Sequence, residues 1–587
     1  MTRQGIVITG EGIVCAIGND VRSVSESLKA KRSGIGEMRY LDSRHHELPV
    51  GEVKMTNGEM KSLLGIAADK QVSRTTLMGI IAVKQALKQA HVEGNDSLRI
   101  LLVSGTTVGG MDITENMFGK MDSPDAPTAW LSHHDCGSCT ADIAGYFGVF
   151  KDYTTISTAC SSAANAFMLA ADMLKAGDAD IVVAGGTEAL SKFHLNGFNS
   201  LMILDKERCR PFDKSRAGLN LGEGAAYVVL ERESDARQRG AKIEAWLTGY
   251  GNACDAFHQT ASSPEDTGAQ LAMQKALRMA GLRPEDVQWV HAHGTGTPDN
   301  DKSESVAIRE VYADHLPLVS STKGFTGHTT SASGAISAII SIIAMHEGFV
   351  PENYGFHEPI DGGIVPVEDN APAQLHNVMV NSFGFGGNDS SLILSDSNVG
   401  NPSEPEFSDA DIIEASRVEN DNVETLKDVK QYVKPMEARR MGKLMKSTLL
   451  TSLKALEEAG VDMPDAIVTG TAEGSLEYSE RLLEQLAAGD DMVKPTYFMQ
   501  STHNTMSSLT AIHLKCHGYN ITFTQGDRSL EWAVYQAKLL LRSGRYKTVL
   551  VGCNDESTPQ YNSFMERIGK KPLPMVHSVA MVLKLNE

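Results

Sequence analysis

Short apolar runs alternate with longer alanine-rich segments along the first two thirds of the chain. The runs are rich in Val and Ile, as expected of strands that are buried on both faces. They include residues 99–104, 153–158, 181–184, 287–292 and 377–381. Apolar strands separated by helical segments indicate a parallel or mixed sheet with helices on both faces. The pattern therefore predicts the α/β class.

The character of the sequence changes near Ser395. The next fifteen residues are polar and rich in Ser, Asp, Pro and Glu, without any apolar period. Such composition is typical of a linker. A helical pattern resumes near Glu437 and continues through Leu456. We therefore expect a linker over residues 399–430 and a further structured unit after it.

The unit after the linker repeats the first part of the chain. Residues 467–474 echo 102–109, residues 495–498 echo 127–130, residues 519–524 echo 153–158, and residues 541–552 echo 174–185. The order is kept and the spacing drifts by only a few residues. Four matches in order indicate that the tail is a partial copy of the N-terminal half.

The composition excludes several classes of protein. The net charge of −20, with no run of Lys or Arg, argues against a nucleic-acid partner. The eight dispersed cysteines do not form a disulfide framework, and the single Cys-x-x-Cys pair, Cys136 and Cys139, is expected to be two small buried residues on a helix. No apolar stretch is long enough to cross a bilayer, and the N-terminus lacks signal-peptide features. We expect a cytoplasmic protein without membrane insertion.

Cys160 is expected at a strand-to-helix turn. The sequence Thr-Ala-Cys-Ser-Ser at 158–162 follows a predicted strand and opens an alanine-rich helix. Backbone N–H groups and the helix dipole at that position favour a thiolate and lower the thiol pKa. A lone cysteine is, however, usually a buried structural residue. This motif alone does not distinguish a catalytic cysteine from a structural one.

Two histidines strengthen the catalytic interpretation. His293 lies in a Gly-Thr-rich segment after the predicted strand 287–290, and His328 ends a segment that follows the predicted strand 316–319. Open α/β sheets place functional groups just past the strand ends, and the flanking glycines allow close approach to a ligand. One such histidine is usually a core residue. Two of them, together with a cysteine at a helix start, indicate an active site.

At this point the chain resembles a known family, the β-ketoacyl-acyl-carrier-protein synthases of the elongating class, in the thiolase superfamily. The matching segments are residues 6–14, 158–162, 209–224, 292–297, 321–328 and 381–387. The resemblance covers roughly residues 4–396 and keeps its order throughout.

The resemblance implies a role for each motif. Cys160 would attack the thioester of an acyl primer and hold the acyl group covalently. His293 and His328 would stabilise the enolate that forms when a malonyl extender loses carbon dioxide. Lys323 and Glu304 match a supporting charged pair that orients His328.

Further positions match the family's substrate contacts. The backbone N–H groups of Cys160 and Phe385 would form the oxyanion hole, and Phe385 would also gate the acyl pocket. The other expected substrate-binding residues are Thr295 and Thr297 for the phosphopantetheine arm, Val108 for the acyl pocket, and Phe383 and Gly386 in the loop of Phe385. The second histidine favours malonyl decarboxylation over the Cys-His-Asn and two-cysteine chemistries of related enzymes.

The resemblance also implies an architecture and partners. We expect a thiolase-like layered αβαβα fold from two duplicated halves, residues 1–250 and 251–398, followed by the linker and an inactive half-domain over 431–587. The partner would be acyl carrier protein, with no cofactor and no metal. The family pairs through the strand before the nucleophile, so a homodimer is expected.

Three points depart from the family or remain open. His291 has no assigned role, and Asn388 and Asp389 stand where Thr-Asn is usual. In the tail, the position of Cys160 falls at Gly526 or Asp527, so no thiol is present, and we favour a non-catalytic half-domain that covers surface or aids dimerisation. The neighbouring Gln525 resembles the glutamine of chain-length-factor partners.

The alternative function is a non-catalytic subunit that determines chain length, and the retained cysteine and histidines argue against it. Bulk fatty-acid synthesis and a specialised polyene or polyketide pathway both remain open. The tail favours the specialised pathway.

Overall fold

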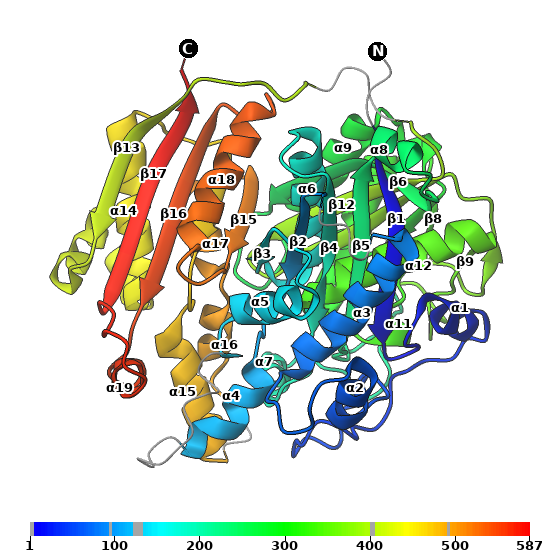
Figure 1. Ribbon diagram of the computed structural model, residues 1–587, viewed down its shortest axis with the longest axis horizontal. Helices are drawn as coiled ribbons and strands as arrows, with labels where there is room; N and C mark the ends of the chain where they lie inside the picture. The colour runs from blue at the N-terminus through cyan, green and yellow to red at the C-terminus, as the bar shows by residue number, and fades with distance from the viewer. Residues whose placement is uncertain (1–4, 93–96, 121–132, 400–404, 490–492, 587) are drawn as a thin grey trace.

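One large mixed sheet organises the molecule (Figure 1). The computed structural model describes residues 5–92, 97–120, 133–399, 405–489 and 493–586. Within those residues, fifteen strands lie in the order β13-β17-β16-β14-β15-β3-β2-β4-β5-β1-β6-β12-β11-β7-β8. The expectation of an α/β fold with mixed sheets is confirmed.

The strands have these bounds. The first ten in the chain are β1 (Ile6–Cys15), β2 (Ile100–Gly105), β3 (Asp152–Ile156), β4 (Ile181–Glu188), β5 (Gly224–Arg232), β6 (Ala245–Cys254), β7 (Trp289–His291), β8 (Leu318–Ser320), β9 (Phe349–Val350) and β10 (Ala371–Pro372). The rest are β11 (Asn377–Gly384), β12 (Asn388–Ser395), β13 (Ile412–Asn420), β14 (Ala466–Gly470), β15 (Tyr519–Phe523), β16 (Thr548–Glu556) and β17 (Val576–Leu585). The short β9 and β10 pair with each other outside the large sheet.

Helices cover both faces of the sheet in the part of the chain before the tail, here called the catalytic part after the function that the sequence predicts for it. α6 (Ser162–Lys175) packs on β2 and β4, and α12 (Ser333–Glu347) packs on β5 and β11 and also contacts α6. The first twelve residues of α12 are all buried, because strands and α6 surround this small and apolar helix. On the outer faces, α3 (Arg74–Ala90) covers β1 and β5, and α9 (Thr267–Ala280) covers β6 and β12. These layers are the expected αβαβα arrangement.

The other helices complete the two parts of the chain. Before the tail they are α1 (Val21–Lys29), α2 (Asn57–Leu64), α4 (Met111–Met117), α5 (Cys136–Phe147), α7 (Lys192–Ser200), α8 (Glu233–Gln238), α10 (Pro298–Tyr312) and α11 (Lys323–Thr326). In the tail they are α13 (Pro435–Ala438), α14 (Lys443–Ala459), α15 (Leu476–Ala487), α16 (Pro495–Ser501), α17 (Thr505–Leu514), α18 (Ser529–Arg542) and α19 (Pro559–Arg567). No helix in the described ranges is long and apolar enough to cross a membrane.

The tail is a structural copy of the N-terminal half. Its strand order β13-β17-β16-β14-β15 mirrors β1-β5-β4-β2-β3, so the two sets meet at β15 and β3. The repeats at 467, 519 and 549 fall at the matching strands β14, β15 and β16, which confirms the partial duplication. The proposed echo at 127–130 lies outside the described residues.

The junction of the two parts is an antiparallel contact between β15 and β3, in which Phe523 faces Ile156. The amide of Ser157 donates to Thr522 at 2.9 Å, and the amide of Thr524 donates to Thr155 at 3.0 Å. We expected a second copy of the chain at this edge, as in a homodimer. That expectation is wrong for this edge, because the chain's own tail already occupies it.

Ionic contacts reinforce the junction. Arg545 donates to both carboxylate oxygens of Asp172 at 2.7 Å, and Asp172 is 3% exposed. Arg528 donates to both oxygens of Asp152 at 2.6 and 2.8 Å. In each pair the arginine belongs to the tail and the aspartate to the catalytic part. Such two-pronged pairs fix relative position as well as adding energy.

The expected linker is shorter than predicted. Residues 412–420, inside the range assigned to it, form β13 and pair with β17 at the outer edge of the sheet. None of the nine β13 residues is fully buried. Only one side of this edge strand pairs with another strand, so its side chains remain partly exposed and can be polar. Its composition therefore resembles that of a linker, which is what the sequence suggested.

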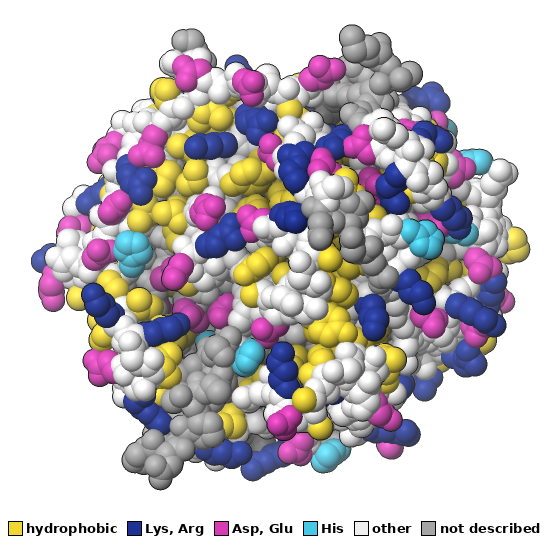
Figure 2. Space-filling model, viewed as in Figure 1, with side chains coloured by type: hydrophobic (Ala, Val, Ile, Leu, Met, Phe, Trp, Pro, Cys, Tyr) yellow, Lys and Arg dark blue, Asp and Glu magenta, His cyan; other side chains and the backbone are white. Residues whose placement is uncertain are grey.

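The net negative charge does not gather on the face shown in Figure 2. Lys and Arg side chains are interspersed there with Asp and Glu over both parts of the chain. All eight cysteines are free and buried, as expected for a chain without a disulfide framework.

Candidate active site

Cys160 lies where the sequence predicted, between β3 and α6. A short 3-10 turn, Ala159–Ser161, follows β3 and leads directly into α6. Ala159 adopts φ 51°, a left-handed conformation that a residue with a Cβ rarely takes. This strained turn places the sulfur at the start of a helix of small residues.

Two histidines converge on that sulfur. Nε2 of His328 lies 3.0 Å from Sγ of Cys160. The ring centroids of His293 and His328 are 5.3 Å apart with the planes nearly perpendicular. One nitrogen of each histidine and the cysteine sulfur all lie within 4.8 Å of one another. Three of the four predicted catalytic residues therefore share one buried pocket, and the fourth, Lys323, lies beside His293.

The supporting charged residues surround His293. Glu304 accepts the backbone N–H groups of His293 at 2.8 Å and of Gly294 at 2.7 Å. Nζ of Lys323 donates to the carbonyl of His293 and lies 3.4 Å from its Nδ1. The prediction that this pair orients His328 is wrong, because its contacts hold the loop and the ring of His293. The His328 backbone N–H instead donates to Asn220 at 2.7 Å.

Burial dominates the electrostatics of the site. It raises the pKa of the Cys160 thiol to about 12, although the charge of Lys323 and the backbone N–H of Phe385 act in the opposite direction. The predicted lowering of this pKa is therefore wrong, because the cost of a buried anion exceeds the benefit of the helix start. Burial and the charge of Lys323 lower the pKa of both His293 and His328 well below the usual range. Both rings are neutral at pH 7.

Two cavities meet at Cys160. The outer cavity is lined by the predicted substrate contacts Thr295, Thr297, Phe383 and Gly386, with His293 and His328 at its base. The inner cavity runs past Val108. Phe385 lines both cavities, and its ring stacks on Phe198 with centroids 5.6 Å apart. This position between the cavities is the one expected of a gate.

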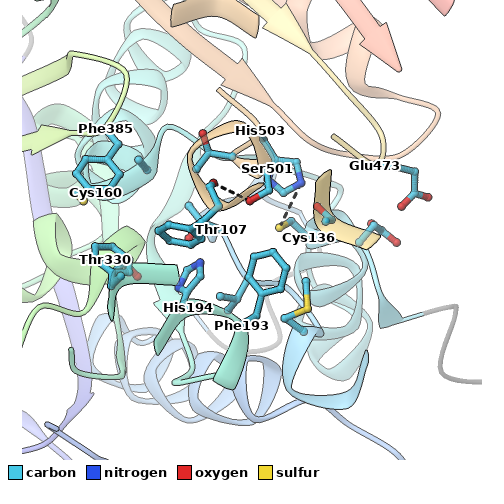
Figure 3. A pocket seen from close by; sticks show the side chains of 18 of the residues that line it. Thr107, Cys136, Cys160, Phe193, His194, Thr330, Phe385, Glu473, Ser501 and His503 are labelled. Carbon is cyan, nitrogen blue, oxygen red and sulfur yellow. Dashed lines mark hydrogen bonds between the residues drawn. The ribbon is translucent and has the colours of Figure 1, made fainter. Parts of the chain in front are cut away.

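The inner cavity is built by both parts of the chain. Figure 3 shows Cys160 and Phe385 at one side of it and Glu473 at the other, with His503 and Cys136 between them. The tail contributes Glu473, Ser479, Phe498, Ser501, Thr502 and His503 to the lining. Sequence reasoning missed these residues. The repeat was a usable signal, since it showed that the tail could take the place of a second subunit.

The family-level comparison agrees with this geometry. The N-terminal domain of the β-ketoacyl synthases matches residues 3–236, and the C-terminal domain of the same enzymes matches residues 244–357. A second N-terminal domain of β-ketoacyl synthases matches residues 414–587. The 3-oxoacyl-[acyl-carrier-protein] synthase 2 of Staphylococcus aureus (strain N315) is 34% identical over 411 residues, which cover 66% of this chain and 97% of that protein.

The chain belongs to the β-ketoacyl synthase family.

One solved structure extends the likeness in fold to the tail. A structure described as "PfaC Keto synthase-Chain length factor" covers 99% of this chain and 78% of its own, with a TM-score of 0.81 and 16% identity. At that identity the match shows the shared fold alone. "The ishigamide ketosynthase/chain length factor" is 30% identical, covers 67% of this chain and 99% of its own, and has a TM-score of 0.63.

The tail of the ketosynthase has no nucleophile at the place of Cys160. Gly526 adopts φ 53° and accepts from the hydroxyl of Ser529, as Ala159 adopts φ 51° and accepts from the hydroxyl of Ser162, so Asp527 stands at the place of Cys160. Gln525 is tied to the catalytic part, since its Nε2 donates to the carbonyl of Gly137 at 3.2 Å and its Oε1 accepts from Thr155 at 2.9 Å. Gln525 therefore serves the junction between the two parts.

Two of the departures from the family pattern, His291 and Asn388, have structural explanations. His291 is buried, and its ring nitrogens contact Ser341 and Thr322 at 3.1 and 2.9 Å, so it is a satisfied core residue. Asn388 accepts from Ser161 at 2.7 Å and donates to the carbonyl of Asn520 in the tail at 2.6 Å. The unusual asparagine thus links the turn that carries the nucleophile to the half-domain.

Proposed function

We propose that this ketosynthase condenses an acyl group held on Cys160 with malonyl-acyl-carrier protein, releasing carbon dioxide and β-ketoacyl-acyl-carrier protein. The observation that carries the proposal is the contact of His328 with Cys160 at 3.0 Å, with His293 beside them. The names of the curated relatives support the same chemistry. The substrates would arrive on the phosphopantetheine arm of an acyl carrier protein.

The first half-reaction loads the enzyme. The thiol of Cys160 is protonated at rest because burial raises its pKa. Neutral His328 takes this proton as the sulfur attacks the primer thioester, and the departing phosphopantetheine thiolate takes the proton back. The backbone N–H groups of Cys160 and Phe385 stabilise the oxyanion. The product is an acyl-Cys160 thioester with the chain in the inner cavity.

The second half-reaction forms the carbon–carbon bond. The malonyl thioester carbonyl accepts hydrogen bonds from His293 and His328, each of which keeps one ring N–H donor in its neutral form. Carbon dioxide leaves, and the electron pair of the broken bond forms the enolate. The enolate carbon attacks the acyl carbonyl, and the Cys160 thiolate departs. Loss of the malonyl carboxylate as carbon dioxide generates the carbanion, so the condensation needs no protein-bound cofactor.

The tail would act as an internal counterpart of a chain-length factor. It carries Asp527 instead of a thiol at the place of Cys160, but it occupies the edge of β3 and lines the inner cavity. The 30% identical ketosynthase structure is itself described with a chain length factor, which supports this proposal. The alternative function, a chain that only determines length, requires loss of the catalytic residues, whereas Cys160, His293 and His328 are all in place. One chain would therefore combine both activities.

The test uses the purified full chain with an acyl-carrier and a malonyl-carrier protein. We expect β-ketoacyl-carrier product from the wild type and none from Cys160→Ala, with both proteins folded to the same extent by circular dichroism. Full activity of Cys160→Ala would overturn the proposal. Absence of product from the wild type with primers of every length tested would favour the chain-length-only alternative.

A further inference from the structure

The inner cavity changes character along its length. Close to Cys160 the lining is aromatic, with Phe198 between Phe385 and Phe498 at centroid distances of 5.6 and 5.1 Å. Phe498 comes from the tail and also contacts the ring of His194 at 5.8 Å. Flat side chains from both parts of the molecule thus enclose the section that would hold the middle of an acyl chain.

The far section is polar. His503 of the tail lies midway, with Nδ1 3.2 Å from the hydroxyl of Ser157 and Nε2 4.0 Å from the sulfur of Cys136. Burial lowers the pKa of His503 to about 4, so the ring is neutral. Beyond it, Figure 3 shows the carboxylate of Glu473 at the end of the cavity away from Cys160.

Among the described residues, only one of the two carboxyl oxygens of Glu473 has a hydrogen-bond partner. Oε1 accepts from the hydroxyl of Tyr561 at 2.7 Å, which fixes the side chain. Oε2 is buried and has no hydrogen-bond partner among the described residues. A buried carboxyl oxygen left unpaired destabilises any complex in which the ligand cannot reach it with a donor. The terminal methyl group of an ordinary fatty acyl chain has no donor to offer.

A second carboxyl group lines the same cavity. It belongs to Asp135, the N-cap residue of α5, which accepts the amide of Ser138 at 2.8 Å. Burial raises the pKa of Glu473 to about 7, and burial together with the charge of Glu473 raises that of Asp135 to about 6. This end of the cavity therefore presents two carboxyl groups, each able to accept a hydrogen bond and, when protonated, to donate one. A hydroxyl group can use both.

We infer that Glu473, supplied by the tail, makes the acyl pocket selective for chains that carry a hydroxyl group at the end far from the thioester. This inference rests on the proposed loading of Cys160 and names the class of acyl group that is loaded. The aromatic section accommodates the carbon chain, and the polar section pairs with its hydroxyl end. Glu473 is thus a specificity-determining residue, remote from the reacting atoms.

The experiment compares loading rates for two matched series of acyl-carrier proteins. One series carries plain chains from hexanoyl to tetradecanoyl, and the other carries the same chains with a terminal hydroxyl. Mass spectrometry measures acyl transfer to Cys160 of the full chain. For chains long enough to reach Glu473, we expect the hydroxylated member to load faster by about tenfold, the ratio that one net hydrogen bond provides. Shorter pairs should load equally.

Variants assign the preference to Glu473. Glu473→Leu should abolish the preference or reverse it, while Glu473→Gln, which keeps a hydrogen-bonding end, should retain most of it. Glu484→Leu, at an exposed position on the neighbouring helix α15, is the matched control and should behave as wild type. Equal loading of acetyl by all variants shows that each is folded.

The outcomes separate this inference from the proposed function. If plain and hydroxylated chains of every length load Cys160 equally, the proposed function stands and the inference is wrong. If Glu473→Leu keeps the full preference, another group provides it, and the inference is again wrong. If no acyl carrier loads Cys160, the proposed function fails and the inference fails with it.

Discussion

Nε2 of His328 lies 3.0 Å from the sulfur of Cys160, while Nδ1 of the same ring is buried and has no hydrogen-bond partner among the described residues. With no group holding Nδ1, the tautomer of this ring is free to change as the sulfur gains or loses a proton. His293 differs, because Lys323 lies against its Nδ1 at 3.4 Å. The two histidines therefore contribute unequally to the two half-reactions.

That difference predicts distinct phenotypes. His293→Ala should still acylate Cys160 at close to the wild-type rate but lose malonyl decarboxylation by about 10²–10³-fold, since one oxyanion donor is removed. His328→Ala should lose decarboxylation to a similar extent and also slow acylation by about 10²-fold, because the sulfur loses its base. Single-turnover acylation and carbon dioxide release measure the two effects. Equal acylation rates in the two variants would contradict this division of roles.

The buried thiol predicts an unusual reactivity profile. Because the pKa of Cys160 is raised to about 12, the thiolate fraction should increase by about tenfold per pH unit from pH 6 to pH 9. The rate of iodoacetamide alkylation at Cys160, followed by peptide mass spectrometry, should rise with pH without levelling off in that interval. A plateau between pH 6 and pH 8 would show a lowered pKa and contradict the structure. Cys160→Ala provides the blank.

The contacts at the junction predict that replacing two different arginines of the tail lowers the free energy of unfolding by different amounts. Arg545→Ala leaves the nearly inaccessible Asp172 without its main counter-charge and should destabilise the protein by about 3 kcal/mol. Arg417→Ala removes an exposed pair with Glu419 and should cost at most about 0.5 kcal/mol. Urea denaturation followed by fluorescence measures both. Similar midpoints for the two variants would show that the ionic contacts of the junction contribute little.

The occupied edge of β3 predicts the solution state. The tail supplies the strand that a second subunit would otherwise provide, so the full chain should sediment as a monomer of 63.3 kDa at micromolar concentration. Analytical ultracentrifugation is the measurement. A stable dimer would mean that a different surface associates, or that β15 leaves β3 in solution.

Local sequence patterns predicted which residues the fold brings together at the site. The turn at Cys160 and the segments ending at His293 and His328 are short, and each needs only neighbouring residues to place its side chain past a strand. The electrostatic environment was harder to predict. The helix start at Cys160 suggested a lowered pKa, but its burial depends on residues distant in the chain, among them His328 and Phe385.

The pairing of strands that are distant in the chain could not be predicted from the sequence. The repeat at Tyr519 showed that the tail copies β3 and its neighbours, yet it could not show whether β15 would face β3 of the same chain or of another. The strand at Ile412–Asn420 was missed because an edge strand with no fully buried residue has the composition of a linker. Glu473 lines the inner cavity because the tail packs against the first part of the chain, and this packing could not be predicted from the sequence.

The most direct test of the proposed condensation is intact mass spectrometry of the full chain after incubation with an acyl-carrier protein and then with a malonyl-carrier protein. We expect the chain first to gain the mass of one acyl group on Cys160. It should then lose that mass as β-ketoacyl-carrier protein appears, and Cys160→Ala should show neither step. An acyl group found at any other residue, or an acyl-Cys160 that malonyl-carrier protein cannot discharge, would contradict the proposed condensation.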